Sequence, residues 1–182
     1  MEIENIYPVI VQGIGVCAAI CSVTSQIFKK VRTYYIAQLV ANVLWMTHFI
    51  MLGQPPGAVI NGLCMLRFVF LITGKHWAKG RKMMIAFLIM SVVVGAVTYS
   101  GIVSLIPAAM LFVSTVIVWS GNNVLIHIFQ IALFSPCWLV YDYLAGSYSG
   151  VLTEVFNIIM VIIFFISMHK AKKAKVQQTI HI

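Results

Sequence analysis

Long apolar stretches, interrupted by short polar or glycine-containing segments, dominate this chain. Several of them lie near the lower end of the ~17–25 residues that a membrane-spanning helix needs, and the stretches lack the two-residue alternation of a β-barrel strand. The pattern therefore predicts an all-α chain that crosses a membrane seven times. The seven predicted spans are Ile10–Phe28, Ile36–Leu52, Ala58–Thr73, Met83–Thr98, Ile102–Trp119, Val124–Ala145 and Val151–Met168.

Composition supports the same class of protein. Of the 182 residues, 62% are hydrophobic and only 9% are charged, and the mean hydropathy is +1.01. A soluble fold of this length cannot hide so much apolar surface. The first residues, Met1–Glu4, are acidic rather than basic, so we expect no cleavable signal peptide and a first span that is retained.

The basic residues between the spans fall on alternate loops. The turns at Gly53–Gly57, Tyr99–Gly101 and Gly146–Gly150 carry no charge. Because loops rich in Lys and Arg stay in the cytoplasm, we expect the N-terminus outside and the C-terminus in the cytoplasm. The basic residues follow spans one, three and seven: Lys29, Lys30, Arg32; Lys75, Lys79, Arg81, Lys82; Lys170, Lys172, Lys173, Lys175.

The net charge of +8 follows from this topology signal and from a basic tail. The basic residues are divided among several loops and form no single patch, which argues against nucleic acid as a partner. For the tail, residues 170–182, the alternative to a solvated topology signal is contact with anionic lipid headgroups.

One spacing of residues occurs twice, at an offset of 93 positions. Spans one to three then match spans five to seven, and an odd linker span makes the two repeats parallel, related by an axis along the membrane normal. The matched positions are Trp45 and Trp138, Gly53 and Gly146, Gly57 and Gly150, and Asn61 and Glu154. The predicted segments are a first three-helix bundle (1–75), a linker loop and helix (76–100), a second three-helix bundle (101–169) and a basic cytoplasmic tail (170–182).

Duplicated bundles in a membrane typically bind a solute between the repeats, and four residues are candidates for such a site. Glu154 costs roughly 2.5–3.5 kcal/mol to insert as a charge, so it should face the interior, where it would bind a cationic group or exchange a proton. Asn61, opposite it, would donate and accept hydrogen bonds. Trp45 and Trp138 would stack on a ring or attract a cation. The alternatives are a Glu154 that reaches headgroup water, interhelical hydrogen bonding by Asn61, and plain packing of the tryptophans.

Other polar and aromatic residues in the spans are expected to have structural roles. Arg67 should extend its side chain to the cytoplasmic interface. Asp142 should lie at the outer interface, and His48 should be a hydrogen-bonded structural residue. The aromatic residues at cytoplasmic span ends are expected to anchor in the headgroup region; they are Tyr34, Tyr35, Trp77 and Trp119.

No residue pattern typical of catalysis or of metal binding can be recognised in this sequence. The four cysteines lie within spans, without His or carboxylate partners at similar depth, and are expected to be small packing residues; they are Cys17, Cys21, Cys64 and Cys137. The phosphate-loop, zinc-protease and serine-hydrolase motifs do not occur. We therefore expect no enzyme activity, no catalytic residue, no metal and no cofactor.

Three helices, a linker helix and three helices resemble the SWEET and PQ-loop superfamily. Ser25–Lys30 resembles a degenerate Pro-Gln box, Trp45 resembles the aromatic residue of the superfamily's sugar site, and Asn61 matches its pocket asparagine. Glu154 departs from this pattern at the second asparagine position. The resemblance further implies Gln26 and two prolines of spans five and six, Pro107 and Pro136, as candidate gating or hinge residues.

A closer resemblance lies near the C-terminal end. The run from Trp138 through Ala145, Gly146 and Gly150 to Glu154 resembles the YgjV family of bacterial inner membrane proteins. This resemblance implies a multi-pass protein of the bacterial inner membrane.

These features favour a transporter or facilitator of a small solute, bound between spans 1–3 and 5–7 against Trp45, Asn61, Trp138 and Glu154. A cationic, vitamin-like heterocycle or a sugar would fit these residues. The alternative is a non-transporting membrane scaffold or subunit that interacts with lipid or with a membrane partner. The sequence specifies no oligomeric state.

Overall fold

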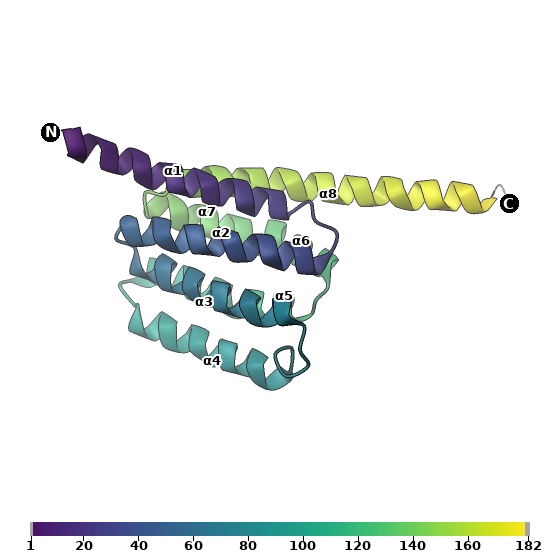
Figure 1. The fold of residues 1–182 in the computed structure, drawn as a ribbon, viewed down its shortest axis with the longest axis horizontal. Helices are drawn as coiled ribbons and strands as arrows, with labels where there is room; N and C mark the ends of the chain where they lie inside the picture. Colours follow the sequence, from purple (N-terminus) through teal and green to yellow (C-terminus); the bar gives the residue numbers. More distant parts are fainter. Residues whose placement is uncertain (1, 181–182) are drawn as a thin grey trace.

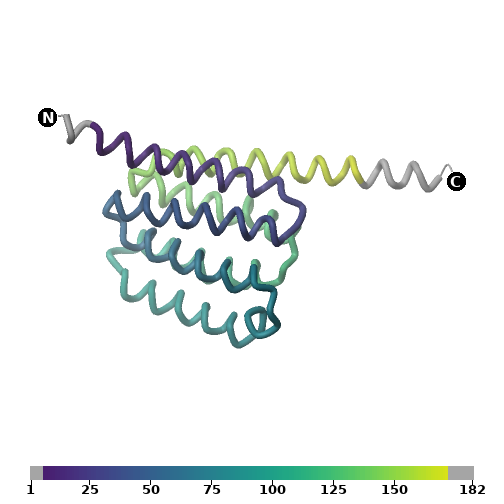
Figure 2. Tube along the Cα trace, viewed as in Figure 1, coloured from purple at the N-terminus to yellow at the C-terminus, as the bar shows by residue number. Residues whose placement is uncertain are grey.

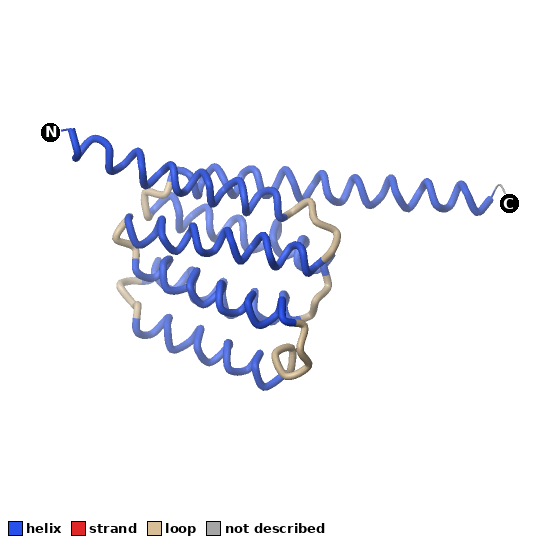
Figure 3. The backbone as a smooth tube through the Cα atoms, in the orientation of Figure 1, coloured by secondary structure: helices blue, strands red, loops and turns tan. Residues whose placement is uncertain are grey.

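The computed structural model describes the backbone of residues 2–180 and the side chains of residues 6–171. All regular structure in this part of the chain is helical (Figure 3), which confirms the predicted all-α class. Seven long helical segments follow one another. They are α1 (Glu2–Ser25), α2 (Val31–Met51), α3 (Pro55–Thr73), α4 (Arg81–Val97), α5 (Leu105–Trp119) preceded by the 3-10 turn η1 (Ile102–Ser104), the continuous series α6 (Asn123–Phe129), π-helical η2 (Gln130–Phe134) and α7 (Ser135–Leu144), and α8 (Tyr148–Ile180).

The helices form two layers that close into a ring. The first layer is the row α1, α2, α3 and α4, and behind it lie α8, the α6–α7 segment and α5 (Figure 1). Helix α1 packs on α8 and α3 packs on α5, so the two layers meet along both edges. Helix α4 lies outside the ring, against α3 and α5. The ring is therefore built by α1–α3 from one half of the chain and by α5–α8 from the other.

The chain passes back and forth between the two ends of the bundle (Figure 2). The turns after α2, α4 and α7 gather at one end, and the loops after α1, α3 and α5 gather at the other. The second end holds the basic loop residues that follow α1 and α3, including Lys29, Lys30 and Lys75. The charge alternation seen in the sequence thus becomes a charge difference between the two ends of the bundle.

The outer surface is apolar, as expected for contact with lipid. Side chains such as Val9, Val92 and Ile162 are exposed on the outside. Five of the helical segments are long and apolar enough to cross a membrane. They are Ile6–Ser25, Pro55–Thr73, Ile102–Trp119, Asn123–Leu144 and Tyr148–Ala171. Helix α4 has only 17 residues, and α2 is less apolar because one of its faces carries the polar groups described below.

Two glycine turns have the same hydrogen-bond pattern at an offset of 93 residues. Gly53 and Gly146, which follow α2 and α7, have positive φ values of 66° and 72°, the left-handed conformation that glycine adopts without a steric penalty. Both turns are Schellman motifs, which satisfy the last helical carbonyls. The bonds are Gly53 N to Ile50 O (3.0 Å), Gln54 N to Phe49 O (2.9 Å), Gly146 N to Tyr143 O (3.3 Å) and Ser147 N to Asp142 O (2.9 Å).

The second matched glycine pair permits close packing. A Cβ atom on Gly57 would lie 2.8 Å from the Tyr141 hydroxyl, and one on Gly150 would lie 2.6 Å from a carboxylate oxygen of Asp142. Both distances are shorter than side chains tolerate. The two glycines therefore let α7 approach the first turns of α3 and α8.

Hydrogen bonds join the two halves of the chain at the end with the glycine turns. The Tyr141 hydroxyl accepts a bond from the backbone N–H of Gly57 (2.9 Å). His48, at the position matching Tyr141, lies 2.9 Å from the Ser147 hydroxyl through Nε2 and 2.9 Å from the Val11 carbonyl through Nδ1. The prediction that His48 is a hydrogen-bonded structural residue is confirmed, since its side chain is fully buried.

Two further hydrogen bonds join the halves at the end with the basic loops. Tyr35 donates its hydroxyl proton to the carbonyl of Val118 (2.7 Å), and His127 Nε2 hydrogen-bonds the carbonyl of Gln26 (2.7 Å). Tyr34 and Tyr35 are only 4% and 3% exposed, so the prediction that they anchor in headgroups is wrong. They point inward because they pack with Phe68, and depth along a span does not reveal which face a residue occupies.

The first prediction concerns the positive-φ glycines. Gly53→Ala and Gly146→Ala should each lower the free energy of unfolding by about 1–2 kcal/mol, because an L side chain is strained in the left-handed region. The control is Gly13→Ala in α1, where a Cβ would meet nothing within 4 Å and helix propensity should favour alanine. Denaturation of the purified variants in detergent measures the difference. Equal stability of all three variants would contradict the turn assignment.

The second prediction concerns the Tyr141 hydroxyl. Tyr141→Phe removes the acceptor for the buried N–H of Gly57 and should cost roughly 1–3 kcal/mol of stability. Tyr143→Phe is the matched control on the same helix, since Tyr143 is 67% exposed and should change stability by less than about 0.5 kcal/mol. The same denaturation assay compares the two; a loss of equal size in both variants would remove this contact from the account.

Candidate binding cavity between the two helix layers

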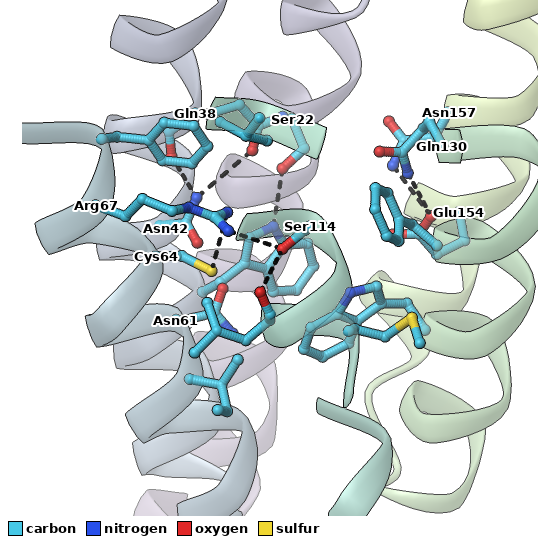
Figure 4. Close-up of a pocket in the computed structure, with 18 of the residues that line it drawn as sticks. Ser22, Gln38, Asn42, Asn61, Cys64, Arg67, Ser114, Gln130, Glu154 and Asn157 are labelled. Carbon is cyan, nitrogen blue, oxygen red and sulfur yellow. Dashed lines mark hydrogen bonds between the residues drawn. The ribbon is translucent and has the colours of Figure 1, made fainter. Parts of the chain in front are cut away.

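The ring of helices encloses a cavity of about 120 Å³. A water molecule needs roughly 10–15 Å³ of such space, so the cavity is large enough for several waters or a small solute. Its walls come from α1, α2, α3, α5, the η2–α7 segment and α8, and Figure 4 displays most of the lining side chains. The polar lining residues are Ser22, Gln26, Tyr34, Gln38, Asn42, Asn61, Cys64, Arg67, Ser114, Gln130, Asp142, Glu154 and Asn157.

All four residues predicted for the solute site line this one cavity. The tryptophans are joined by a third ring, that of Phe49. The Phe49 ring stacks on Trp138 with centroids 6.3 Å apart and is tilted against Trp45 at 6.0 Å. Trp45 also donates its indole N–H to the hydroxyl of Ser22 (2.9 Å). These contacts build an aromatic wall, Trp45–Phe49–Trp138, along one side of the cavity.

Glu154 is held by neutral amides. Its Oε2 accepts hydrogen bonds from Gln130 Nε2 (3.5 Å) and Asn157 Nδ2 (3.3 Å), and Gln130 also donates to the hydroxyl of Ser135 (3.0 Å). The side chain is 8% exposed and faces the cavity beside Gln130 and Asn157 (Figure 4). It therefore does not extend to headgroup water, which was the alternative expectation for this carboxyl group.

Asn61 lies on α3, on the other side of the cavity. Its side-chain amide donates to the carbonyl of Gly57 in its own helix (2.8 Å). Among the described residues it makes no side-chain bond to another helix, so the alternative role as an interhelical link is not supported there. Asn61 is 7% exposed and lines the cavity.

Arg67 also faces this cavity, and its predicted position at the membrane interface is wrong. The guanidinium donates from one nitrogen to the hydroxyls of Ser114 (2.8 Å) and Thr115 (3.1 Å) and from another to the Cys64 sulfur (3.6 Å). Its central carbon lies 5.1 Å from the ring centroid of Phe68. With 3% exposure, the side chain turns into the bundle because hydroxyl groups of α5 are within reach there.

Asp142 is the second residue whose predicted position is wrong. It is 4% exposed and lines the cavity instead of lying at the interface. Its carboxylate packs against the first turn of α8, where Gly150 leaves space for it. At the matching position of the first half the residue is Phe49, so this acidic group belongs to one half alone.

Several buried polar atoms of the cavity have no hydrogen-bond partner in the described part of the chain. Gln26 Oε1, Arg67 Nε, Asp142 Oδ1 and Asn157 Oδ1 are all of this kind, and all four side chains line the cavity. An unpaired buried polar group costs about 1–3 kcal/mol. The unused donors and acceptors are concentrated where a bound solute would pair with them.

The three candidate hinge residues occupy different local environments. Gln26 directly follows α1, is 1% exposed and lines the cavity. Pro107 lies in the first turn of α5, where a missing N–H breaks no helical bond. Pro136 lies at the start of α7, directly after the π-helical segment η2, and a proline within a helix removes one hydrogen bond of the regular ladder. Of the two prolines, Pro136 is thus the one at a helix irregularity.

Sequence reasoning missed Arg67, Asp142, Gln130 and Asn157 as cavity residues. One signal was present on α2, where Gln38, Asn42, Trp45 and Phe49 recur at three- and four-residue spacing and so share one helix face. A polar stripe within an apolar span indicates a cavity-facing side. Among the described residues, no group of three His, Cys, Asp or Glu side chains is placed to hold a metal ion.

No curated protein and no solved structure matches this chain. A family model described as a bacterial inner membrane protein, Imp-YgjV, matches residues 9–172. The match extends from α1 into α8 and so includes every helix that contributes to the cavity. The apolar outer surface and the membrane-length helices agree with that description, and the chain belongs to the Imp-YgjV family of bacterial inner membrane proteins.

Proposed function

We propose that this protein carries a small polar solute across the inner membrane and binds it in the cavity between α1–α3 and α5–α8. The observation that supports this proposal is the concentration of charged and unpaired polar groups in one cavity inside a bundle with an apolar outer surface. Ionisable residues inside a membrane protein are costly and mark solute pathways more often than structural positions. A non-transporting scaffold would not need to bury charged groups around a cavity.

The proposed mechanism is a rocking motion of two three-helix bundles, with α4 as their linker, in the SWEET-like arrangement. The matched glycine turns support it, because they give both halves the same local geometry at an offset of 93 residues. In the proposed repeat, α1 corresponds to α5 and α3 corresponds to α8. The two edge contacts, α1 with α8 and α3 with α5, are therefore equivalent to each other. Bundles related in this way can open alternately to the two sides of the membrane.

In this proposal all seven helical segments cross the membrane, including α2 and α4. The basic loops after α1 and α3 lie at one end of the bundle, which we assign to the cytoplasm. The N-terminus is then outside and the C-terminus inside. Two hydrogen bonds join the halves at the glycine-turn end, His48 with Ser147 and Tyr141 with Gly57. They would be broken when the cavity opens outward.

The lining of the cavity favours a solute with a cationic group. Glu154 and Asp142 supply acidic groups, and the aromatic wall supplies faces that attract cations and stack on rings. A cationic, vitamin-like heterocycle satisfies both features. A sugar would use Asn61, Asn42 and Gln38 but would leave the charged groups without a partner. The solute leaves chemically unchanged, since we assign no catalytic role to any lining residue.

The third prediction tests the carrier function through Glu154. A thermal-stability screen of the purified protein against vitamins, nucleosides, sugars and amino acids identifies a ligand, and its uptake into proteoliposomes is then measured. Glu154→Gln keeps the size of the side chain and can still accept a hydrogen bond, but it removes the charge. We expect at least a tenfold loss of uptake, with insertion and monodispersity unchanged.

Ile159→Ala is the control for this experiment. Ile159 lies on the same helix, is 45% exposed on the lipid side, and should retain uptake. Uptake at the wild-type rate in Glu154→Gln would show that the carboxylate takes no part in transport. Absence of any ligand and of any uptake would favour the scaffold alternative.

A further inference from the structure

The charges of the cavity are separated between its two walls. Arg67 projects from α3, whereas Glu154 and Asp142 come from α8 and α7. In Figure 4, Arg67 and Glu154 lie on opposite sides of the space, on different groups of helices. Building on the proposed carrier function, we propose that the solute is a small zwitterion of the free amino acid type, with its anionic group on Arg67 and its ammonium on Glu154 and Asp142.

The Arg67 side provides a site for an anion. All the hydrogen bonds that its guanidinium donates among the described residues go to neutral groups, the hydroxyls of Ser114 and Thr115 and the sulfur of Cys64. Its Nε has no hydrogen-bond partner in the part of the chain that the structure describes. A buried guanidinium without a carboxylate partner is expensive, and a planar carboxylate is the group that its fork of donors fits best. The solute would therefore supply the missing anion.

The opposite wall provides a site for a cation that carries N–H groups. Asp142 Oδ1 is buried and has no donor among the described residues, and the groups there that hydrogen-bond Glu154 are uncharged amides and a hydroxyl. Carboxylate oxygens accept hydrogen bonds and cannot donate them when ionised. A primary or secondary ammonium would satisfy them, while a quaternary ammonium would offer no proton to Asp142.

The separation of positive and negative charge depends on a few residues that differ between the two halves, and the repeat alone would not produce it. The positions in the other half that match Arg67, Asp142 and Glu154 hold Met160, Phe49 and Asn61, respectively, at the same offset of 93. Each of the three charges thus occurs in only one of the two halves: Arg67 in the first, and Asp142 and Glu154 in the second. A purely cationic solute would leave Arg67 unpaired, and a purely anionic solute would leave both carboxylates unpaired. A molecule with both charges pairs with each wall.

Size agrees with this class of solute. A cavity of about 120 Å³ has space for roughly ten water molecules, which is sufficient for a molecule of free amino acid size. The aromatic wall lines the same cavity and is available for an apolar side chain. The proposal therefore favours amino acids with apolar or aromatic side chains over those with an additional charge.

The test uses three matched series of probes on the full-length protein in detergent. These are the standard amino acids, their carboxamides, which keep only the positive charge, and their des-amino acids, which keep only the negative charge. Thermal stability is measured against probe concentration. We expect at least one amino acid to bind with a half-saturating concentration at least tenfold lower than that of either matched analogue.

Two variants assign the anionic group. Arg67→Gln should weaken binding of that amino acid at least tenfold and leave binding of its carboxamide unchanged. Arg32→Gln, an exposed arginine at the start of α2, should leave both unchanged. If Arg67→Gln does not fold, the selectivity of the wild-type protein among the three series decides alone.

The outcomes separate this inference from the carrier function. Carboxamides that bind as tightly as the amino acids, or undiminished amino acid binding in a folded Arg67→Gln, would overturn the zwitterion assignment and leave a cation carrier. Binding and Glu154-dependent uptake of a neutral solute, with no response to any of the three series, would also overturn it while the carrier function stands. No response to any probe, together with no uptake of any solute, would overturn both.

Discussion

The structure depends on one constraint, which is that the bilayer interior offers no hydrogen bonds to protein groups. Every backbone group must be satisfied within the chain, which leaves helices as the elements of this apolar sequence. Polar side chains within the spans therefore turn inward or, like Thr24, hydrogen-bond the backbone of their own helix. The ring of helices meets this demand by presenting apolar residues such as Val92 and Ile162 to lipid and by collecting the polar groups around a central cavity. The cavity and the membrane location are thus two consequences of the same constraint.

Within that ring, the two halves share glycine turns at an offset of 93 residues but differ in their charged side chains. The glycine turns at Gly53 and Gly146 have the same pattern of hydrogen bonds, and Trp45 and Trp138 both contact Phe49 in the aromatic wall. The charged residues differ, since Asn61 in one half corresponds to Glu154 in the other. In the carrier that we propose, the two halves would move against each other, and the lining residues that differ between them would recognise the solute.

Much of the fold could be predicted from the hydrophobic pattern, and part of the site could be predicted from spacing. Seven helical segments, the glycine turns and the four residues Trp45, Asn61, Trp138 and Glu154 in one cavity all follow from positions along the chain. The errors concern direction around a helix. Arg67 lies close enough to the end of α3 to reach the interface, but hydroxyls on α5 hold it inside. Whether the Arg67 side chain points to the interface or into the bundle depends on how α3 packs against α5.

The predicted interfacial position of Asp142 was wrong for a related reason. Its position near a turn suggested exposure, yet the absence of a side chain at Gly150 creates a buried place for its carboxylate. The irregular segment η2 before Pro136, which sets the direction of Gln130 toward Glu154, also requires the surrounding structure. Residue type and depth can be read from a sequence, whereas orientation in a bundle depends on neighbours far along the chain.

The central claim is that a water-accessible cavity for a solute lies between the two halves, and Cys64 tests it most directly. Cys64 lines the cavity, whereas Cys17 is exposed on the outer surface of α1. Two variants, each retaining one of these cysteines, would be treated in native membranes with a small, charged methanethiosulfonate reagent that does not enter lipid. The account predicts modification of Cys64 and none of Cys17. A Cys64 that reacts only after denaturation would contradict it, because the interior would then be closed to water.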